Sequence, residues 1–281
     1  MRVRNKNLRV EPWDGKRAGN WTALFKDTDA VVNLVGEGIS DRPWTMERKF
    51  MIKSSRIDAT RVLVSMVARA RRRPKVFVSG SAVGFYGSVP DGEVTEDSPK
   101  GKGFLSGICS DWEHEAEAVR ELGVRLALLR TGIVIERRGG ALKKLMLPFR
   151  YYLGGPLGSG RQGFPWVHRE DVLGAILHII QNETLSGPVN VVAPETLTMK
   201  QFCEALGKAM KRPSWLPVPA FMLQLILGEM SEMLLTGQNV TPQKLLKSGY
   251  AFQYPRVQEA LQAVFQSSLQ RRKIRTTAGL V

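Results

Sequence analysis

Short apolar runs separated by longer amphipathic stretches organise this chain. Four of these runs are typical of strands buried on both faces, because each is almost continuously apolar and ends in small or polar residues. They cover residues 30–37, 76–78, 124–129 and 188–193. Leu8–Pro12 is a further short strand candidate, and Trp13–Gly15 is its expected turn.

Helical patterns lie between and after these runs. The longest begins at Thr45 and continues through Arg72. Its expected packing side is a broad apolar stripe made of Met46, Phe50, Ile57, Val64 and Val67. Further helices are expected over 104–122 and 198–210. Residues 164–171 are expected to lead into another helix, which has Asp171 in its first turn and continues through Ile180. Strands that alternate with helices predict an α/β fold with a parallel sheet and right-handed crossovers, followed by a small, mostly helical lobe over 214–262.

The stretch Lys75–Gly87 carries the first functional signal. Its apolar run ends in Ser79, Gly80 and Ser81, which are small enough to let a ligand approach the backbone. In open α/β sheets, ligands lie in the crevice beyond the carboxyl ends of the strands. A buried strand followed by a plain glycine and serine turn is the alternative interpretation.

Charge narrows the range of ligands. The formal net charge of +15 over 281 residues suits phosphate-bearing ligands. The basic run Arg69–Arg73 is explained by a solvated helix end, where cations oppose the helix dipole. Because the chain has no zinc spacing, no aromatic-interleaved basic strand and no helix-turn-helix signature, no specific nucleic-acid partner is expected.

Cysteine content and apolar run lengths bear on the compartment. Two distant cysteines, Cys109 and Cys203, give neither a disulfide framework nor a metal-ligand spacing, so no metal site is predicted. A reducing compartment is favoured, the cytoplasm first, with an organelle stroma or matrix as the alternative. No run reaches membrane-spanning length, so no membrane partner is expected.

Several independent strings of the chain are similar to one family. They are DAVVNLVGEGI (29–39), VSGSAVGFYG (78–87), LRTGIVIERRGGAL (129–142), GGPLGSGRQ (154–162), WVHREDV (166–172) and the C-terminal GYAFQYP (249–255). With them the chain resembles the NAD(P)-dependent epimerase family, an atypical branch of the extended short-chain dehydrogenase/reductase superfamily related to nucleoside-diphosphate-sugar epimerases. The resemblance implies a Rossmann-like parallel sheet flanked by helices, an NADP cofactor with NAD as the alternative, and a small-molecule, nucleotide-sugar-like substrate. It is also compatible with a homodimer.

The resemblance also implies roles for individual residues. The cofactor-binding set is Leu34, Val35, Gly36, Arg56, Ser79, Gly80, Thr131, Gly132 and Ile133. Arg161 and His168 would bind substrate, although a purely structural role is the alternative for His168. Ser81 would be catalytic, since it stands where the superfamily keeps a Ser or Thr that hydrogen-bonds a substrate hydroxyl or carbonyl.

One departure from the superfamily concerns the pyrophosphate. In the superfamily, a glycine-rich turn follows the first strand and places the cofactor's pyrophosphate on a helix N-terminus. No G-x-x-G-x-x-G occurs in this chain. The expectation is therefore a sheet truncated at its N-terminal strands and weak cofactor binding. The expected division is an incomplete dinucleotide-binding domain over 1–150, a substrate-side and helical lobe over 151–265 with a strand that returns to the sheet, and a basic tail over 266–281.

A second departure concerns proton transfer. The superfamily's Tyr-x-x-x-Lys pair, whose lysine lowers the tyrosine pKa, is replaced here by Cys109 and Glu113. Cys109 and Tyr86 are the remaining candidates for an acid, with packing as the alternative role of each. Two hypotheses follow. One is an NADP-dependent oxidoreductase or epimerase, impaired in this chain, and the other is a non-catalytic NADP-binding sensor or scaffold.

Overall fold

A parallel sheet forms the centre of the molecule. The computed structural model describes residues 7–137 and 139–266. Within them the main sheet has four parallel strands in the order β1 (Ala30–Asn33), β2 (Val76–Ala82), β4 (Arg125–Thr131) and β7 (Gly187–Val191). The four apolar runs of the sequence all contribute a strand, as predicted.

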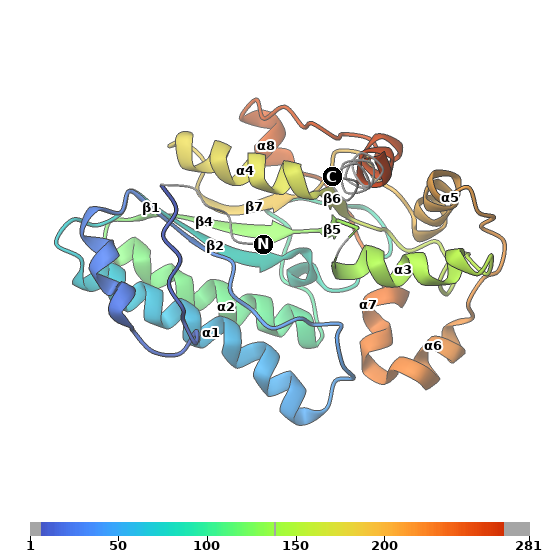
Figure 1. Cartoon of the computed structure of the whole chain (residues 1–281), viewed down its shortest axis with the longest axis horizontal. Helices are drawn as coiled ribbons and strands as arrows, with labels where there is room; N and C mark the ends of the chain where they lie inside the picture. Colours follow the sequence, from blue (N-terminus) through green and yellow to red (C-terminus); the bar gives the residue numbers. More distant parts are fainter. Residues whose placement is uncertain (1–6, 138, 267–281) are drawn as a thin grey trace, which may run out of the picture.

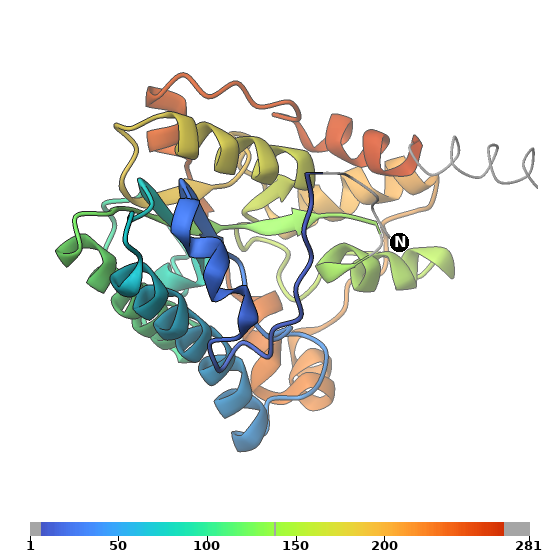
Figure 2. The same ribbon diagram turned by 60° about the vertical axis from the view of Figure 1, so that its left-hand side comes forward.

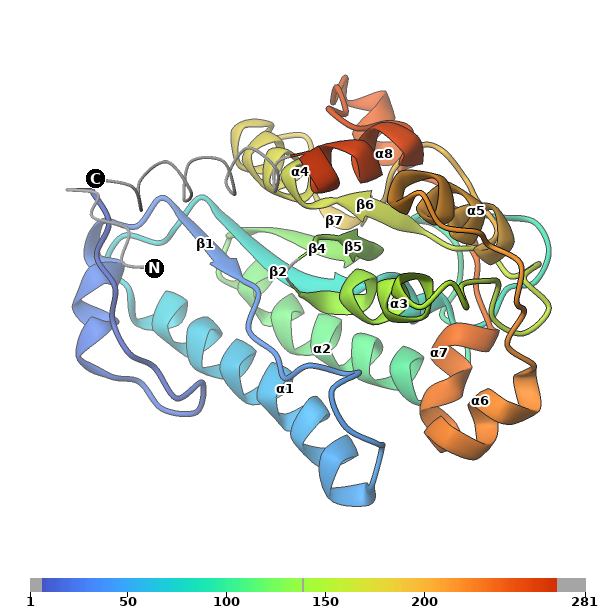
Figure 3. The ribbon, with the colours of Figure 1, turned by 45° about the vertical axis from the view of Figure 1, so that its right-hand side comes forward.

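Helices cover both faces of this sheet (Figures 1 and 3). The first layer holds α1 (Met46–Arg69) and α2 (Phe104–Glu121), and the second holds α4 (Arg169–Gln181) and α8 (Gln243–Lys247). Alternate residues of each strand point to opposite layers. Leu128 of β4 thus packs with the α1 and α2 cluster, while the next residue, Leu129, packs with the α4 and α8 cluster.

Capping side chains fix where two of the helices begin. The Thr45 hydroxyl accepts a hydrogen bond from the Arg48 N–H and starts α1, whose end at Arg69 is close to the predicted one. Thr198 and Gln201 form a reciprocal capping box that starts α5 (Met199–Met210). Both helix starts agree with the sequence predictions.

The remaining elements build the other end of the molecule, at the right of Figure 1. They include the strand pair β5 (Ile133–Ile135) and β6 (Trp166–His168), then α3 (Gly140–Arg150), α5, α6 (Ala220–Leu227) and α7 (Glu232–Leu235). A separate apolar cluster joins them, with Phe149, Trp166 and Phe202 among its buried members. Neither β5, β6 nor α3 was predicted as an element.

A further helical stretch covers residues 257–266 and contributes Val257, Ala260 and Leu261 to the same apolar cluster. The other elements are smaller. They are η1 (Asn20–Asp27), η2 (Val83–Tyr86), η3 (Gly228–Ser231) and a second parallel pair of β3 (Glu93–Val94) with β8 (Asn239–Val240). The segment before β1 runs along the outside of the molecule, and η1 lies beside α1 (Figure 2). None of the described helices is both long enough and apolar enough to cross a bilayer.

Two sequence predictions were wrong. Leu8–Pro12 is not a strand, and its Val10 side chain is 79% exposed. Met46 and Phe50 do not pack on the sheet but are 89% and 71% exposed, because the first turns of α1 extend past the sheet, and packing starts near Ile52. The predicted basic tail lies, apart from Gln266, outside the described residues.

Candidate functional site

The carboxyl ends of the main strands meet at one edge of the sheet. Ser81 of β2 is the register partner of Arg130 of β4, and Ala82 is the partner of Thr131. Thr131 in turn pairs with Val191 of β7. Parallel strands place all these ends on the same side, so the residues that follow them line one crevice edge.

A buried ion pair lies at the centre of this edge. The Arg130 Nε and Nη2 donate to the two carboxylate oxygens of Glu113 on α2, each at 2.9 Å. Ser81 Oγ donates to Glu113 Oε1 at 2.6 Å. The side chains of Arg130 and Glu113 are only 4% and 9% exposed, so the pair is almost fully desolvated. Paired charges with several hydrogen bonds are the form in which proteins bury ions.

The same arginine organises Tyr86. The Arg130 Nη1 donates to the Tyr86 hydroxyl at 3.0 Å, and that hydroxyl donates to Asn190 Oδ1 at 2.7 Å. Burial raises the Tyr86 pKa even though its hydrogen bonds with Arg130 and Asn190 oppose the change. Glu96 closes the network by accepting from the Asn190 N–H through Oε1 at 3.1 Å. Tyr86 is therefore a buried, fully engaged phenol, and an acid role for it stays a prediction.

Cys109 lies one helical turn before Glu113 on α2 and is buried. Burial, together with the negative charge of Glu113, raises the pKa of this thiol to about 11. Cys109 is consequently a neutral thiol near pH 7. It can donate a weak hydrogen bond there, but it holds almost no thiolate.

The exit of β1 is the exposed part of the edge. Leu34 is 56% exposed, and Gly36 is exposed beside it, whereas Val35 is half-buried. Arg56 of α1 reaches across to this loop and donates to the Glu37 carbonyl at 3.0 Å. Burial lowers the Arg56 pKa. The structure thus brings four predicted cofactor residues, Leu34, Val35, Gly36 and Arg56, to one place.

Close packing explains Gly80. A Cβ atom built there would lie 2.6 Å from Trp112 Cη2, so α2 can approach β2 only if the residue is glycine. Trp112 Nε1 donates to Thr60 Oγ1 at 3.0 Å, and that oxygen also accepts from Asn33 Nδ2 at 2.9 Å. The neighbouring Ser79 is fully buried. The cofactor roles given to Ser79 and Gly80 stay predictions.

The end of β4 turns directly into β5. The Ile133 N–H donates to the Pro165 carbonyl at 2.7 Å, and a Cβ at Gly132 would lie 2.7 Å from that same oxygen. Thr131 is half-buried, and its hydroxyl donates to the Leu129 carbonyl at 3.3 Å. Thr131, the register partner of Ala82, thus brings these three predicted residues to the Ser81 end of β2.

His168 and Arg161 differ in their surroundings. His168 is buried at the start of α4, where its Nδ1 accepts from the Glu170 N–H at 3.2 Å. Its ring lies 4.0 Å from the ring of Tyr254, and burial lowers its pKa. This placement favours the structural alternative, a helix cap. Arg161 is exposed in the loop 153–162, and the substrate role of both residues stays a prediction.

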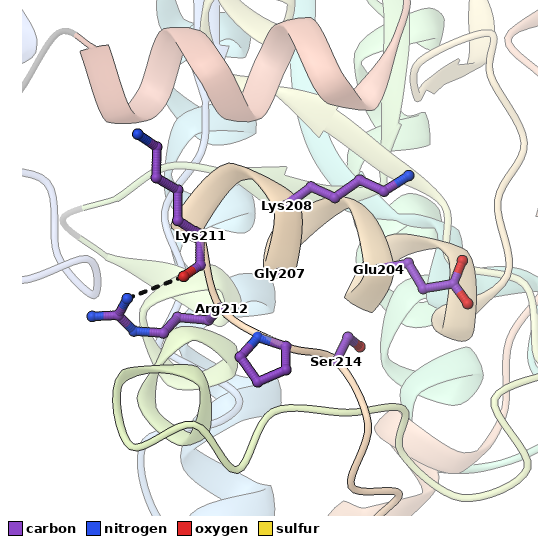
Figure 4. Close-up of a pocket in the computed structure, with 7 residues that line it drawn as sticks. Glu204, Gly207, Lys208, Lys211, Arg212 and Ser214 are labelled. Carbon is purple, nitrogen blue, oxygen red and sulfur yellow. Dashed lines mark hydrogen bonds between the residues drawn. The ribbon is translucent and has the colours of Figure 1, made fainter.

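A shallow pocket lies elsewhere, at the end of α5 (Figure 4). It is lined by Glu204, Gly207, Lys208, Lys211, Arg212, Pro213 and Ser214. The side chains of Lys208 and Lys211 point in different directions, and Arg212 donates to the Lys211 carbonyl (Figure 4). Because these cations do not converge, we place the candidate site at the strand ends instead. Among the described residues, no cluster of His, Cys, Asp and Glu is arranged to hold a metal ion.

Comparison with known proteins decides the family. The chloroplastic SDR39U1 homolog of Arabidopsis thaliana, an epimerase family protein, is 41% identical over 88% of this chain and 71% of its own length. The chain belongs to the SDR39U1 epimerase family. The model of a domain of unknown function, DUF1731, matches residues 218–264, which places that domain at the family's α6–α8 end.

Solved structures agree with this family assignment. The human SDR39U1 family protein, crystallised with NADPH, is 34% identical with a TM-score of 0.79, over 87% of this chain and 85% of that one. A nucleoside-diphosphate sugar epimerase from Corynebacterium glutamicum is 26% identical with a TM-score of 0.70, over 95% of this chain and 58% of that one. The resemblance inferred from the sequence is confirmed.

The sequence patterns of this SDR39U1-family chain did not reveal its central ion pair. In the sequence, Glu113 stands out only as the replacement for a lysine, and Arg130 only as the residue that follows the apolar run 124–129. One signal was available, because a charged residue inside a buried strand and a carboxylate on the packed side of a helix each need a partner. Their separation of 17 residues in sequence does not identify that partner.

Proposed function

We propose that this chain binds NADP(H) along the carboxyl edge of its sheet and acts as an oxidoreductase or epimerase on a nucleotide-sugar-like substrate. The observation that carries the proposal is the likeness to the human family protein crystallised with NADPH. The name of the Corynebacterium relative supports the substrate class.

The residues at the β1 exit fit a dinucleotide. Leu34 offers exposed apolar surface for a ring. Gly36 lets the Arg56 side chain lie against the loop, since a Cβ there would be 2.9 Å from Arg56 Cζ. Arg56 thus supplies a cation at this exit. NADP is the cofactor we propose first, with NAD as the alternative. When bound, its nicotinamide would accept or deliver a hydride, while Ser81 would hold the substrate oxygen.

We also propose that affinity and turnover are low in this 281-residue chain. None of the described strands passes through a G-x-x-G-x-x-G turn into a helix, which is the arrangement that gives a pyrophosphate its backbone amides. Without that cradle, the pyrophosphate would contribute little to the binding energy.

Calorimetric titration with NADPH tests the binding proposal, with NADH as the matched control. We expect a dissociation constant weaker than about 1 μM, which corresponds to about −8 kcal/mol, and weaker still for NADH. Sub-micromolar affinity would contradict the impairment. No binding of either nucleotide at millimolar concentration would contradict the function itself.

A second candidate function is a non-catalytic NADP-binding sensor or scaffold. Two observations favour it: the Tyr86 hydroxyl is engaged on both sides inside the protein, and the pKa of Cys109 is raised to about 11. Neither group is then poised for acid–base work near pH 7. A panel of nucleotide-sugars assayed with NADP+ and NADPH separates the candidates, because the sensor predicts cofactor binding without turnover.

Assembly and location remain proposals as well. We propose a small-molecule substrate, no specific nucleic-acid partner and a homodimer as an admissible state, which sedimentation would test. The cytoplasm is the proposed location, and the name of the Arabidopsis relative places that protein in the chloroplast.

A further inference from the structure

The Ser81 hydroxyl has a defined direction in this structure. Its single proton is committed to Glu113 Oε1 at 2.6 Å, a short bond of the kind that hydroxyls form with ionised carboxylates. Glu113 cannot turn away, because Arg130 holds both of its oxygens. All three residues are at least nine-tenths buried, so water does not compete for these bonds.

The lone pairs of Ser81 Oγ remain available to accept hydrogen bonds. The Cys109 thiol is a neighbour of this serine, whose side chain is among the groups that act on the pKa of the thiol. A hydroxyl has one proton and two lone pairs. Because its proton is bound to Glu113, Ser81 can offer a ligand only an acceptor.

We propose that Glu113, held by Arg130, is a positioning residue that makes Ser81 Oγ a hydrogen-bond acceptor, so that this edge of the sheet selects a ligand hydroxyl over a ligand carbonyl. The inference rests on the proposed function only for the identity of that ligand, a hydroxyl of the sugar. Glu113 and Arg130 thereby become part of the site. Of the two ligand oxygens that a serine here could bind, a hydroxyl and a carbonyl, the arrangement favours the hydroxyl.

The direction of the Ser81 hydroxyl is testable without any ligand, through the reactivity of Cys109. In Glu113→Gln, a neutral amide replaces the carboxylate that accepts the serine proton, so the charge-assisted bond is lost. The serine proton is then held less firmly and becomes available to the neighbouring Cys109 sulfur, where it would stabilise the thiolate. The rate of alkylation by iodoacetamide follows the thiolate fraction, which changes tenfold for each unit of pKa.

Peptide-level mass spectrometry at pH 8.5 would give the alkylation rates of both cysteines. We expect Cys109 to react about tenfold faster in Glu113→Gln than in the wild type. Part of this gain comes from the lost negative charge of Glu113 and persists in Glu113→Gln/Ser81→Ala, whereas the part that depends on the serine hydroxyl disappears there. Equal rates in the single and double variants, with Cys203 still unreactive, would overturn the proposal.

The buried Cys203 reports general opening of the protein. If it reacts as fast as Cys109 in Glu113→Gln, the same comparison is made in Glu113→Gln/Arg130→Gln, which leaves no buried charge unpaired. If adding Ser81→Ala to that double variant slows the alkylation of Cys109, the proposal is supported. If the alkylation rate stays the same, the proposal is overturned.

Hydroxyl selection is tested separately by calorimetry with saturating NADPH. The probes are UDP-glucose and four analogues, each with one sugar hydroxyl replaced by fluorine, which cannot donate. We expect one analogue to bind at least tenfold more weakly than UDP-glucose to the wild type, and equally well to Ser81→Ala. The selection would be overturned if every analogue bound the wild type as well as UDP-glucose does. It would also be overturned if the weaker binding of an analogue persisted in Ser81→Ala, or if no sugar bound at all. The proposed function falls only if NADPH also fails to bind.

Discussion

Arg130 and Glu113 form a two-point ion pair between the sheet and α2, and both side chains are almost completely buried. Removing one member of such a pair leaves an uncompensated charge in a poorly solvated place, which costs about 3–5 kcal/mol. Replacing both members with neutral groups avoids that cost.

We therefore expect Arg130→Met to lower the free energy of unfolding by about 3–5 kcal/mol. Glu113→Gln/Arg130→Met should be more stable than Arg130→Met alone, since no charge is stranded. Urea denaturation of the wild type, both single variants and the double variant measures the coupling. Strictly additive losses would show that the two charges do not depend on each other.

The close approach of Trp112 to Gly80 leads to a prediction about packing. Gly80→Ala places a methyl group 2.6 Å from Trp112 Cη2, and overpacking of this kind costs about 1–3 kcal/mol. Trp112→Phe removes the ring atom in the way, so the double variant should lose less stability than the two single changes together. Gly107→Ala is the control, because nothing lies within 4 Å of its added Cβ. Thermal unfolding measures all four proteins, and additivity would argue against the proposed clash.

The pKa of His168 predicts a pH dependence of stability. Burial lowers this pKa below the ordinary value of 6.5, so folding favours the neutral ring, whose Nδ1 accepts the Glu170 N–H. That contribution is fully present above pH 6.5 and is lost as the pH falls through the lower folded pKa. The free energy of unfolding should thus decline from pH 7.5 to pH 5.

His168→Asn should flatten this decline, because asparagine caps a helix without titrating. His114→Gln is the control, since His114 is exposed on α2. Urea denaturation at pH 7.5, 6 and 5 measures the three slopes. If His168→Asn keeps the slope of the wild type, then His168 is not its source.

Arg56 predicts an effect on cofactor affinity, under the proposed function. Arg56→Ala removes a cation from the β1 exit and frees the loop held through the Glu37 carbonyl, so NADPH should bind about tenfold more weakly, or by about 1.4 kcal/mol. Arg61→Ala is the matched control, because Arg61 lies on the same helix but pairs with Glu115 in an exposed position. Equal affinity of Arg56→Ala and wild type in calorimetry would remove Arg56 from the cofactor site.

The order of strands and helices was predictable because local patterns carry it. Buried runs such as Val76–Val78 are apolar at every position, and the Thr45 and Thr198 caps mark helix starts with side chains of their own. The exposure of Met46 and Phe50 was not predictable, because it depends on how far α1 extends past the sheet.

The sequence likewise predicted those parts of the site that depend on strand order, but not those that depend on how a helix packs on the sheet. The sequence located Ser81 and Thr131 at neighbouring strand ends, since parallel order alone places them there. The bond from Ser81 to Glu113 requires a particular rotation of α2 against the sheet, and the packing of Trp112 on Gly80 fixes that rotation. No residue spacing encodes it.

Ser81 and Arg130 are register partners on the neighbouring strands β2 and β4, so the pairing of the two main chains fixes their alignment. Sliding β2 by a single residue against β4 would turn the serine toward the opposite helices and leave the arginine facing a different neighbour. Changes in the surrounding loops could thus reshape what enters the crevice while this pair of side chains keeps its alignment.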